Sequence, residues 1–264
     1  MAPQIPKTTR SYYFPALGSY TNLTLQTASI PSIKATHVLV KVHAVSLQYR
    51  DLIIASNNYP ATIEPDNLVP CSDMAGEVVA IDGDIDADII NTALGAGQQG
   101  VLTEYRTFND YSLVKIPDHL SYEEASTLPC AGLTAYNALM GPRPVKAGDS
   151  VLVLGTGGVS IFGLQLAVAS GATVIATSSS DAKLAIAKKL GATHTINYNT
   201  TPDWDKEVLR LTDGRGVDHI LEAHSESTRP VIDKVFSFEE AIDAYAHLES
   251  QKHVGKVVIR VVPA

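Results

Sequence analysis

Residues 150–160 read Ser-Val-Leu-Val-Leu-Gly-Thr-Gly-Gly-Val-Ser, and this stretch decides the fold. Its apolar part, Val151–Leu154, has the length and composition of a buried strand. Glycines follow at once, and a segment of helical character then runs from Ser160 to Ser170 before Gly171. This order of strand, glycine turn and helix predicts a phosphate cradle. Glycine lets the backbone turn tightly, and the free N–H groups at the helix start attract an anion.

Strands and helices continue to alternate beyond this turn. We expect strands over 173–177, 194–198 and 217–221, and helices over 182–190 and 202–212. This alternation predicts βαβ units in a parallel, doubly wound α/β sheet of the Rossmann type.

The glycine turn alone is a weak signal, since glycines also serve ordinary strand–helix turns. The sheet context favours a dinucleotide site. Ser160 takes the place of the third glycine of the pattern and is small enough to keep the helix close to the strand. The expected coenzyme-binding residues of the turn are Gly155, Thr156, Gly157, Gly158 and Val159.

The end of the second strand indicates which coenzyme is bound. It reads Ala-Thr-Ser-Ser-Ser over 176–180, without the Asp or Glu that would bind the ribose hydroxyl of NAD. Ser178 and, on the next helix, Lys183 supply hydroxyl and ammonium groups that suit a 2′-phosphate. The sequence therefore favours NADPH over NADH. The alternative is that Lys183 is an ordinary solvated helix residue.

The first third of the chain has a β pattern. Short β-branched runs at 38–45 and 76–81 predict strands, and 102–108 with 111–116 predicts a hairpin around Asn109-Asp110. Together they predict a small barrel or sandwich.

Two capping boxes, Ser121–Glu124 and Ser237–Glu240, predict helix starts. A closing strand is expected over 256–262. After the second box, apolar residues at helical spacing predict one buried stripe, made of Phe238, Ala241, Ile242, Tyr245 and Leu248.

Composition excludes several classes of protein. The net charge is −8 and the chain has two cysteines, Cys71 and Cys130. An acidic chain is unlike a nucleic-acid binder, and two cysteines do not form a disulfide framework. No apolar run is long enough to cross a membrane, and the N-terminus lacks a signal-peptide pattern. We expect a soluble, cytoplasmic protein that binds a small-molecule substrate, with no nucleic acid or membrane as partner.

The chain resembles the medium-chain dehydrogenase/reductases, on their zinc-independent, quinone-oxidoreductase-like and alcohol dehydrogenase-like side. The matching stretches, besides the glycine turn, are 44–52, 69–77, 127–136, 190–192, 236–241 and 253–258. The resemblance implies a GroES-like barrel domain over 1–125, completed by 231–264. A Rossmann-like nucleotide domain would occupy 126–230.

The resemblance implies an oxidoreductase that transfers hydride from NADPH to a quinone, an enone or another activated carbonyl, or that oxidises an alcohol. Zinc-dependent relatives hold the metal at positions that are Gln48, Ser72 and Cys130 here, so no zinc is expected. Cys130 is then expected to be a small buried residue.

Further residue roles follow from the resemblance alone. Thr134 would lie against the nicotinamide, and Tyr49, Arg50 and Asp51 would line the substrate cleft as catalytic residues. The alternative for these three is that Tyr49 packs in the core and Arg50 pairs with Asp51. Tyr198 would touch the 2′-phosphate, or be a core tyrosine.

The chain is shorter than this family at two places, after Ile81 and after Glu222. Four sheet strands are expected instead of six, and the missing half builds much of the nicotinamide side. A catalytically inactive nucleotide-binding or interaction protein is therefore an open alternative, and so is a fragment that aggregates. A homodimer also stays open, because relatives pair through strands that are missing here.

Overall fold

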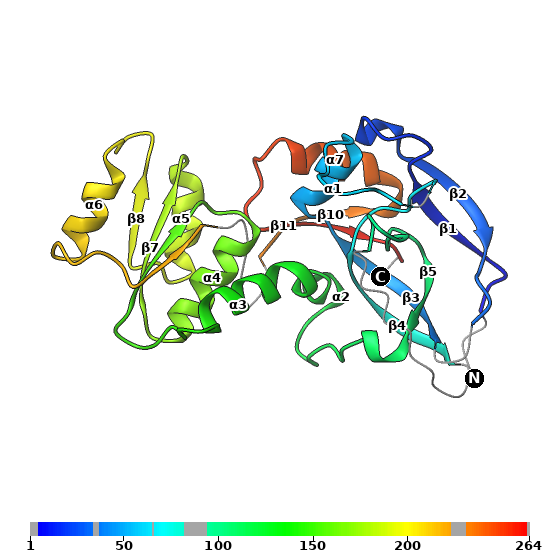
Figure 1. Cartoon of the computed structure of the whole chain (residues 1–264), viewed down its shortest axis with the longest axis horizontal. Helices are drawn as coiled ribbons and strands as arrows, with labels where there is room; N and C mark the ends of the chain where they lie inside the picture. The colour runs from blue at the N-terminus through cyan, green and yellow to red at the C-terminus, as the bar shows by residue number, and fades with distance from the viewer. Residues whose placement is uncertain (1–4, 34–36, 65, 82–93, 223–230, 263–264) are drawn as a thin grey trace. The chain divides into compact units, whose positions relative to one another are not determined.

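The computed structural model describes residues 5–33, 37–64, 66–81, 94–222 and 231–262 (Figure 1). The chain divides into two compact units. The first unit comprises residues 1–127, 234–252 and 257–264, and the second comprises 128–233 and 253–256. The C-terminal segment therefore returns to the unit that the N-terminal segment begins. The places where the sequence indicates shortening, after Ile81 and after Glu222, adjoin residues outside the described part.

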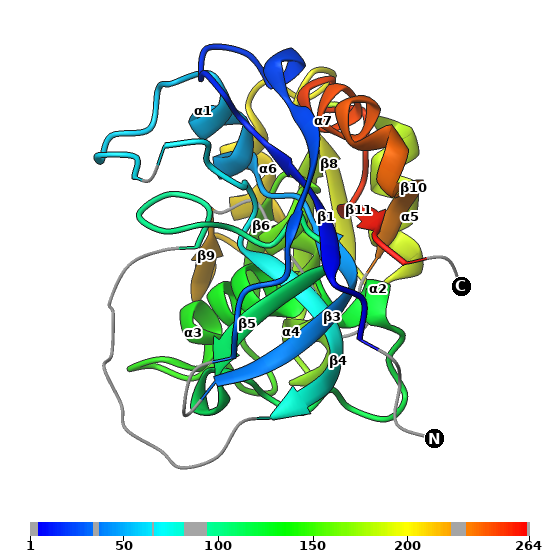
Figure 2. The same cartoon turned by 90° about the vertical axis from the view of Figure 1, so that its right-hand side faces the viewer.

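The first unit is built on antiparallel strands. β3 pairs with β4, with β5 and with β11, and β1 pairs with β2; β5, β3 and β4 lie side by side in Figure 2. Val40 and Val42 of β3 face the core, and after an irregularity between Val42 and Ala44 the core residue is Val45; each of the three is at most 2% exposed. The strands are β1 (Thr8–Tyr13), β2 (Thr24–Ser29), β3 (His37–Ser46), β4 (Asp73–Ile81), β5 (Tyr105–Asn109), β10 (Ile232–Ser237) and β11 (Lys256–Arg260).

The hairpin expected over 102–116 is wrong. β5 pairs with β3, with Asn109 opposite His37, and a 3-10 turn, η2 (Asp110–Ser112), follows it. Residues 113–116 form no strand, and Val114 is 91% exposed. The local pattern resembled a hairpin, but the strand found its partner about seventy residues earlier in the chain, a pairing that local turn chemistry does not encode.

Both capping boxes form as expected. Ser121 Oγ accepts from Glu124 N–H at 3.1 Å at the start of α2 (Tyr122–Ala125). Ser237 N–H donates to Glu240 Oε2 at 2.8 Å at the start of η4 (Phe238–Glu240), which leads into α7 (Ala241–Glu249). The apolar stripe is buried except at Ile242, which is 38% exposed. Ile242 lies at the edge of the stripe, one position beyond the buried Ala241.

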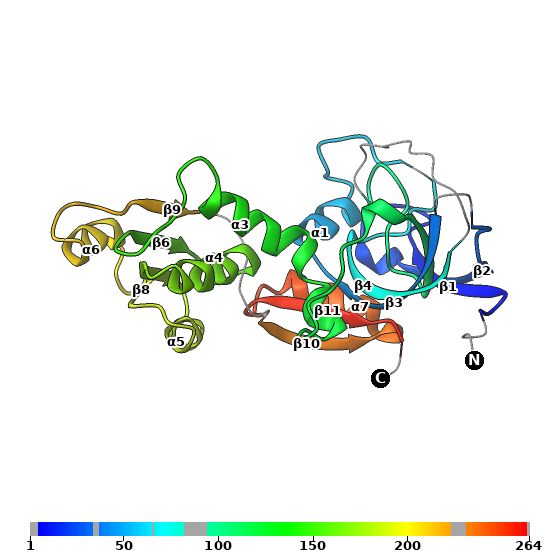
Figure 3. The same cartoon turned by 90° about the horizontal axis from the view of Figure 1, so that it is seen from below.

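The second unit is a parallel sheet in the order β8-β7-β6-β9, as the α/β prediction requires. Three of these strands, β9, β6 and β8, are labelled in Figure 3. One face packs mainly against α3, α4 and α5, and the other against α6. The predicted fold class is confirmed. The elements are η3 (Leu128–Gly132), α3 (Leu133–Met140), β6 (Ser150–Leu154), α4 (Gly158–Ala169), β7 (Thr173–Ser178), α5 (Asp181–Lys189), β8 (His194–Asn197), α6 (Trp204–Leu211) and β9 (His219–Leu221).

Helix α4 lies unusually close to the sheet. A Cβ atom at Gly163 would overlap Leu221 Cδ2, and Leu221 is 3% exposed. Gly163 therefore has the close-packing role that the glycine pattern gives to its third position, one helical turn beyond Ser160. No helix among the described residues is long and apolar enough to cross a membrane.

Candidate functional site

The glycine turn, residues 155–159, joins β6 to α4. Gly155 has φ +82°, a conformation that disfavours residues with a Cβ, and its N–H donates to Thr177 Oγ1 at 3.4 Å. Gly157 is the N-cap of α4 and has no side chain to accept from the first-turn N–H groups. Gly155, Gly157 and Gly158 are only half-buried, so their backbone is open to an anion.

The side chains of the turn are buried beneath it. Thr156 is 6% exposed and Val159 is 7% exposed. Ser160, fully buried, donates its hydroxyl hydrogen to Leu154 O at 2.9 Å and so ties the helix start to the end of β6. Gly255 N–H donates to Thr156 O at 3.5 Å, so residues 253–256, which belong to the second unit, lie against the turn. Local sequence patterns carry no signal for that contact.

Ser178, Tyr198 and Lys183 lie near the end of β7. Ser178 is 4% exposed and its Oγ accepts from Ser180 N–H at 3.4 Å. Tyr198 N–H donates to Ser178 O at 3.1 Å, and its side chain is 42% exposed, so the core alternative for Tyr198 is wrong. Burial lowers the pKa of Lys183, and the charge of Asp233 acts in the opposite direction. Sequence analysis missed Asp233, which β10 supplies fifty residues further along the chain.

Thr134 lies in the first turn of α3 and is exposed. Its hydroxyl donates to Cys130 O at 2.6 Å, which leaves the Thr134 oxygen as an acceptor.

Tyr49, Arg50 and Asp51 form the first turn of α1 (Tyr49–Ala55) in the first unit. Asp51 is 1% exposed, and its Oδ2 accepts from Gln48 N–H at 2.7 Å, a helix-capping bond. Arg50 Nη2 donates to Leu94 O at 3.1 Å, and Arg50 Nε is buried without an acceptor. Tyr49 is 55% exposed. This exposure contradicts the alternative in which Tyr49 packs in the core. The pairing of Arg50 with Asp51 stays an expectation from the sequence.

Of the three positions that the resemblance assigns to zinc ligands, two donate hydrogen bonds to a buried carboxylate. Gln48 Nε2 donates to Asp73 Oδ2 at 2.6 Å, and Ser72 Oγ donates to Asp73 Oδ1 at 2.5 Å. Asp73 is 1% exposed. An amide and a hydroxyl already engaged in this way, with one thiol, do not fit the donor set of a zinc site.

Cys130 belongs to the second unit and is exposed, so its predicted burial is wrong. It lies in the π-helical turn η3, outside the buried stripe of Ala131, Ala135 and Leu139. In the part of the chain that the structure describes, no group of three or more His, Cys, Asp or Glu residues is arranged to hold a metal ion.

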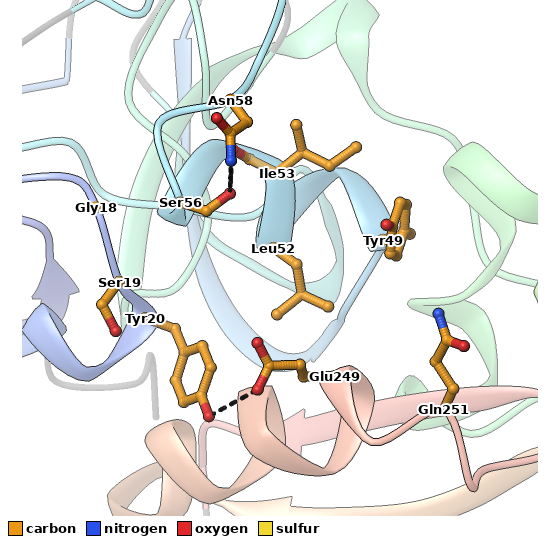
Figure 4. A pocket seen from close by; sticks show the side chains of 10 residues that line it. All are labelled: Gly18, Ser19, Tyr20, Tyr49, Leu52, Ile53, Ser56, Asn58, Glu249 and Gln251. Carbon is orange, nitrogen blue, oxygen red and sulfur yellow. Dashed lines mark hydrogen bonds between the residues drawn. The ribbon is translucent and has the colours of Figure 1, made fainter.

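A cavity of about 500 Å³ opens in the first unit between α1, α7 and the 3-10 turn η1 (Tyr20–Asn22) (Figure 4). Tyr49 and Leu52 of α1 line it from one side, and Glu249 lines it from the end of α7. Tyr20 Oη donates to Glu249 Oε2 at 3.0 Å. The sequence places only Tyr49 at a candidate site, because the other residues meet through tertiary packing.

Comparisons with known proteins identify the family. Residues 34–118 match the alcohol dehydrogenase GroES-like domain, and residues 158–236 and 223–259 match two zinc-binding dehydrogenase families. A zinc-type alcohol dehydrogenase-like protein of Schizosaccharomyces pombe is 36% identical over 314 aligned positions, which cover 85% of this chain and 90% of that protein. The chain belongs to the medium-chain dehydrogenase/reductase family. The resemblance drawn from the sequence is thereby confirmed, and the family is one of oxidoreductases.

Other members of the family agree with this assignment. An Arabidopsis thaliana protein described as an NADPH-dependent alkenal/one oxidoreductase is 30% identical, over 98% of this chain and 81% of that protein. A Sinorhizobium meliloti structure described as a putative alcohol dehydrogenase superposes with a TM-score of 0.87 at 30% identity, over 98% of this chain and all of that one. The alignment to the S. pombe protein spans 314 positions, more than the 264 residues of this chain, so segments of the relative have no counterpart here. The predicted internal shortening is confirmed.

Proposed function

We propose that the chain is an NADPH-dependent, zinc-independent oxidoreductase that transfers hydride to a quinone, an enone or another activated carbonyl, with alcohol oxidation as the reverse chemistry. The observation that carries the proposal is the uncapped N-terminus of α4 behind the glycine turn, where Gly157 leaves the first N–H groups open. The Arabidopsis relative, described as NADPH-dependent and acting on alkenals and alkenones, supports the choice of coenzyme and substrate class.

The second unit supplies the coenzyme contacts in this proposal. NADPH, when bound, supplies the hydride. Backbone N–H groups of residues 157–159 would hold the diphosphate, and Ser178, Lys183 and Tyr198 would bind the 2′-phosphate. The oxygen of Thr134 would be available to accept a hydrogen bond from the nicotinamide.

The first unit supplies the substrate contacts. Arg50 has a buried Nε without an acceptor, and the exposed Tyr49 adds a hydroxyl donor, so both residues are suited to stabilise negative charge on a substrate oxygen. Asp51 acts through Gln48 N–H as a positioning residue for this helix start. A conjugated substrate accepts hydride without a metal, which agrees with the unsuitable donor set of Gln48, Ser72 and Cys130.

A second candidate is a nucleotide-binding protein without catalytic activity. The observation that favours it is the small size of the sheet. β9, beside β6, is the outermost described strand, and segments of the S. pombe relative have no counterpart in this chain. It predicts NADPH binding without hydride transfer. A homodimer and a cytoplasmic location remain predictions from the sequence.

Spectrophotometric turnover separates the two candidates. The purified chain is mixed with NADPH and a panel of benzoquinones, cyclic enones and alkenals, with and without a metal chelator. We expect saturable NADPH oxidation that the chelator does not change. Folded protein that binds NADPH but oxidises it with no member of the panel would support the second candidate, and protein that does not bind NADPH would reject both.

The same assay tests the substrate contacts. Arg50→Gln is expected to reduce kcat about a hundredfold, as expected when a donor to a developing oxyanion is removed. Arg143→Gln, at an exposed arginine of the second unit whose side chain is 72% exposed, is the matched control and should retain full activity. Equal loss in both variants would contradict the role given to Arg50.

A further inference from the structure

The cavity between α1, η1 and α7 has the size and lining of a small-molecule site. Its volume of about 500 Å³ lies within the range of roughly 300–1,000 Å³ typical of ligand pockets. It is roughly three times the cavity of about 150 Å³ that admits benzene. Figure 4 shows Leu52 between the rings of Tyr20 and Tyr49, with Glu249 below it.

One aromatic wall of the cavity, the ring of Tyr20, packs against a buried ring. The ring of Tyr20 stacks on the buried ring of Tyr245, with centroids 6.1 Å apart and planes 22° apart. Tyr49 lies in the first turn of α1, and its side chain is 55% exposed. A ligand in the cavity would therefore meet the ring of Tyr20 already in position, at little cost in the entropy of that side chain.

The polar atoms of the cavity include unused acceptors. Tyr20 donates its hydroxyl hydrogen to Glu249, and Ser56 donates its hydroxyl hydrogen to Ile53 O at 3.1 Å. Asn58 Nδ2 donates to Ser56 Oγ at 3.2 Å. The hydrogen bond to Glu249, followed by burial, raises the pKa of Tyr20, which keeps the phenol a donor. A carboxylate has about four acceptor positions, so Glu249 retains capacity for a ligand that donates.

The charge of the lining residues restricts the class of ligand further. Of the described residues that line the cavity, Glu249 alone carries a formal charge, and none is Lys, Arg or His. An anionic ligand would meet this carboxylate without any compensating cation. A cation would meet this carboxylate, and an apolar body attached to it would meet the two tyrosine rings of the lining.

We propose that this cavity binds an organic ammonium ion, a protonated primary amine on a flat, apolar body. The ammonium group donates to Glu249, while the apolar body packs against Leu52 and the rings of Tyr20 and Tyr49. The proposal goes beyond hydride transfer, since an ammonium ion is no hydride acceptor, and it requires no bound coenzyme. It uses the ring of Tyr49 and not the hydroxyl that the proposed function assigns to a substrate oxygen.

Three probes of similar shape and different charge test the proposal by calorimetric titration of the full chain without coenzyme. They are naphthylmethylammonium, naphthylmethanol and naphthylacetate. We expect millimolar binding of the ammonium probe at low ionic strength, weaker binding of the alcohol, and none of the carboxylate. Equal binding of all three probes, or no binding of the ammonium probe, would overturn the proposal.

Variants locate the charge that is recognised. Glu249→Gln keeps an acceptor for Tyr20 and removes the charge, so it should weaken ammonium binding about fivefold and leave the alcohol unchanged. Asp243→Asn removes an exposed carboxylate from the same helix, outside the cavity, and should change neither. If both variants lost the same amount of ammonium binding, the effect would come from the net charge of the protein and not from Glu249, and the proposed site would be overturned.

A third variant, Tyr20→Phe, is expected not to weaken ammonium binding. It keeps the ring and removes the hydroxyl that donates to Glu249, so ammonium binding should stay the same or strengthen. A loss as large as that of Glu249→Gln would contradict the role given to the carboxylate. Circular dichroism of each variant shows whether it is folded.

Discussion

Replacing Gly163 with alanine tests the packing that places the glycine turn. In an exposed helix interior this change gains about 1 kcal/mol of helix propensity. Here the new Cβ would overlap Leu221 Cδ2, the end of a side chain that is 3% exposed and packed in the same apolar cluster as α4. The two effects therefore have opposite signs.

The clash is expected to prevail. Overpacking a tight core costs about 1–3 kcal/mol, and the upper end applies because Leu221 is buried in the cluster that contains α4. After the propensity gain, the net loss of unfolding free energy is about 2 kcal/mol. With a urea m-value of about 2 kcal/mol/M, the unfolding midpoint should fall by about 1 M.

The chain provides its own probe for this measurement. Its single tryptophan, Trp204, lies in α6 and packs against the apolar cluster on the α6 face of the sheet. Its fluorescence therefore follows unfolding of the second unit. Leu221→Ala is the partner for a double-mutant cycle, since it removes the atom that the added methyl group would meet.

Leu221→Ala alone should cost about 3 kcal/mol, whereas adding Gly163→Ala to it should cost nothing further or restore stability. A raised midpoint for Gly163→Ala alone, or strictly additive losses in the cycle, would refute the packing argument.

Three further predictions follow. Lys183→Gln should weaken NADPH binding about tenfold and leave NADH binding unchanged, as measured by fluorescence titration; equal losses for both would contradict a 2′-phosphate contact. The hydrogen bond from Arg215, with that from Ser150 N–H, lowers the pKa of Asp218. The stability it contributes is therefore full above its ordinary pKa of 3.8 and lost as the pH falls below it, and Asp218→Asn should flatten the urea midpoint between about pH 5 and pH 3. In the native protein a thiol reagent should label Cys130, which is exposed, while Cys71, buried and with a raised pKa, should react only after unfolding.

Local patterns predicted the parts of the fold that depend on neighbours in sequence. The two capping boxes use residues three positions apart, and both form. The strand–turn–helix at 150–160 also forms, because apolar run, glycines and helix are contiguous. Such features need no knowledge of distant partners.

Features that depend on residues distant in sequence were either not predicted or predicted wrongly. β5 pairs with β3, although its own sequence suggested a local hairpin. Arg50 donates to Leu94 O, forty-four residues further along the chain, and Asp233 acts on Lys183 from fifty residues away. The close contact at Gly163 and the cavity at Glu249 likewise arise where helices pack on elements remote in sequence. A single sequence carries no direct signal for such packing.

The central claim is that the N-terminus of α4 binds the diphosphate of NADPH. Gly157, its N-cap, has φ −78° and ψ −174°, which an aspartate adopts readily. Gly157→Asp would supply a capping carboxylate, stabilise the helix by about a few tenths of a kcal/mol and fill the anion position. Calorimetric titration with NADPH should then show binding to the natural chain and none to the variant, whose urea midpoint is unchanged or higher. No association of the natural chain at millimolar NADPH, or equal binding by the variant, would contradict the claim.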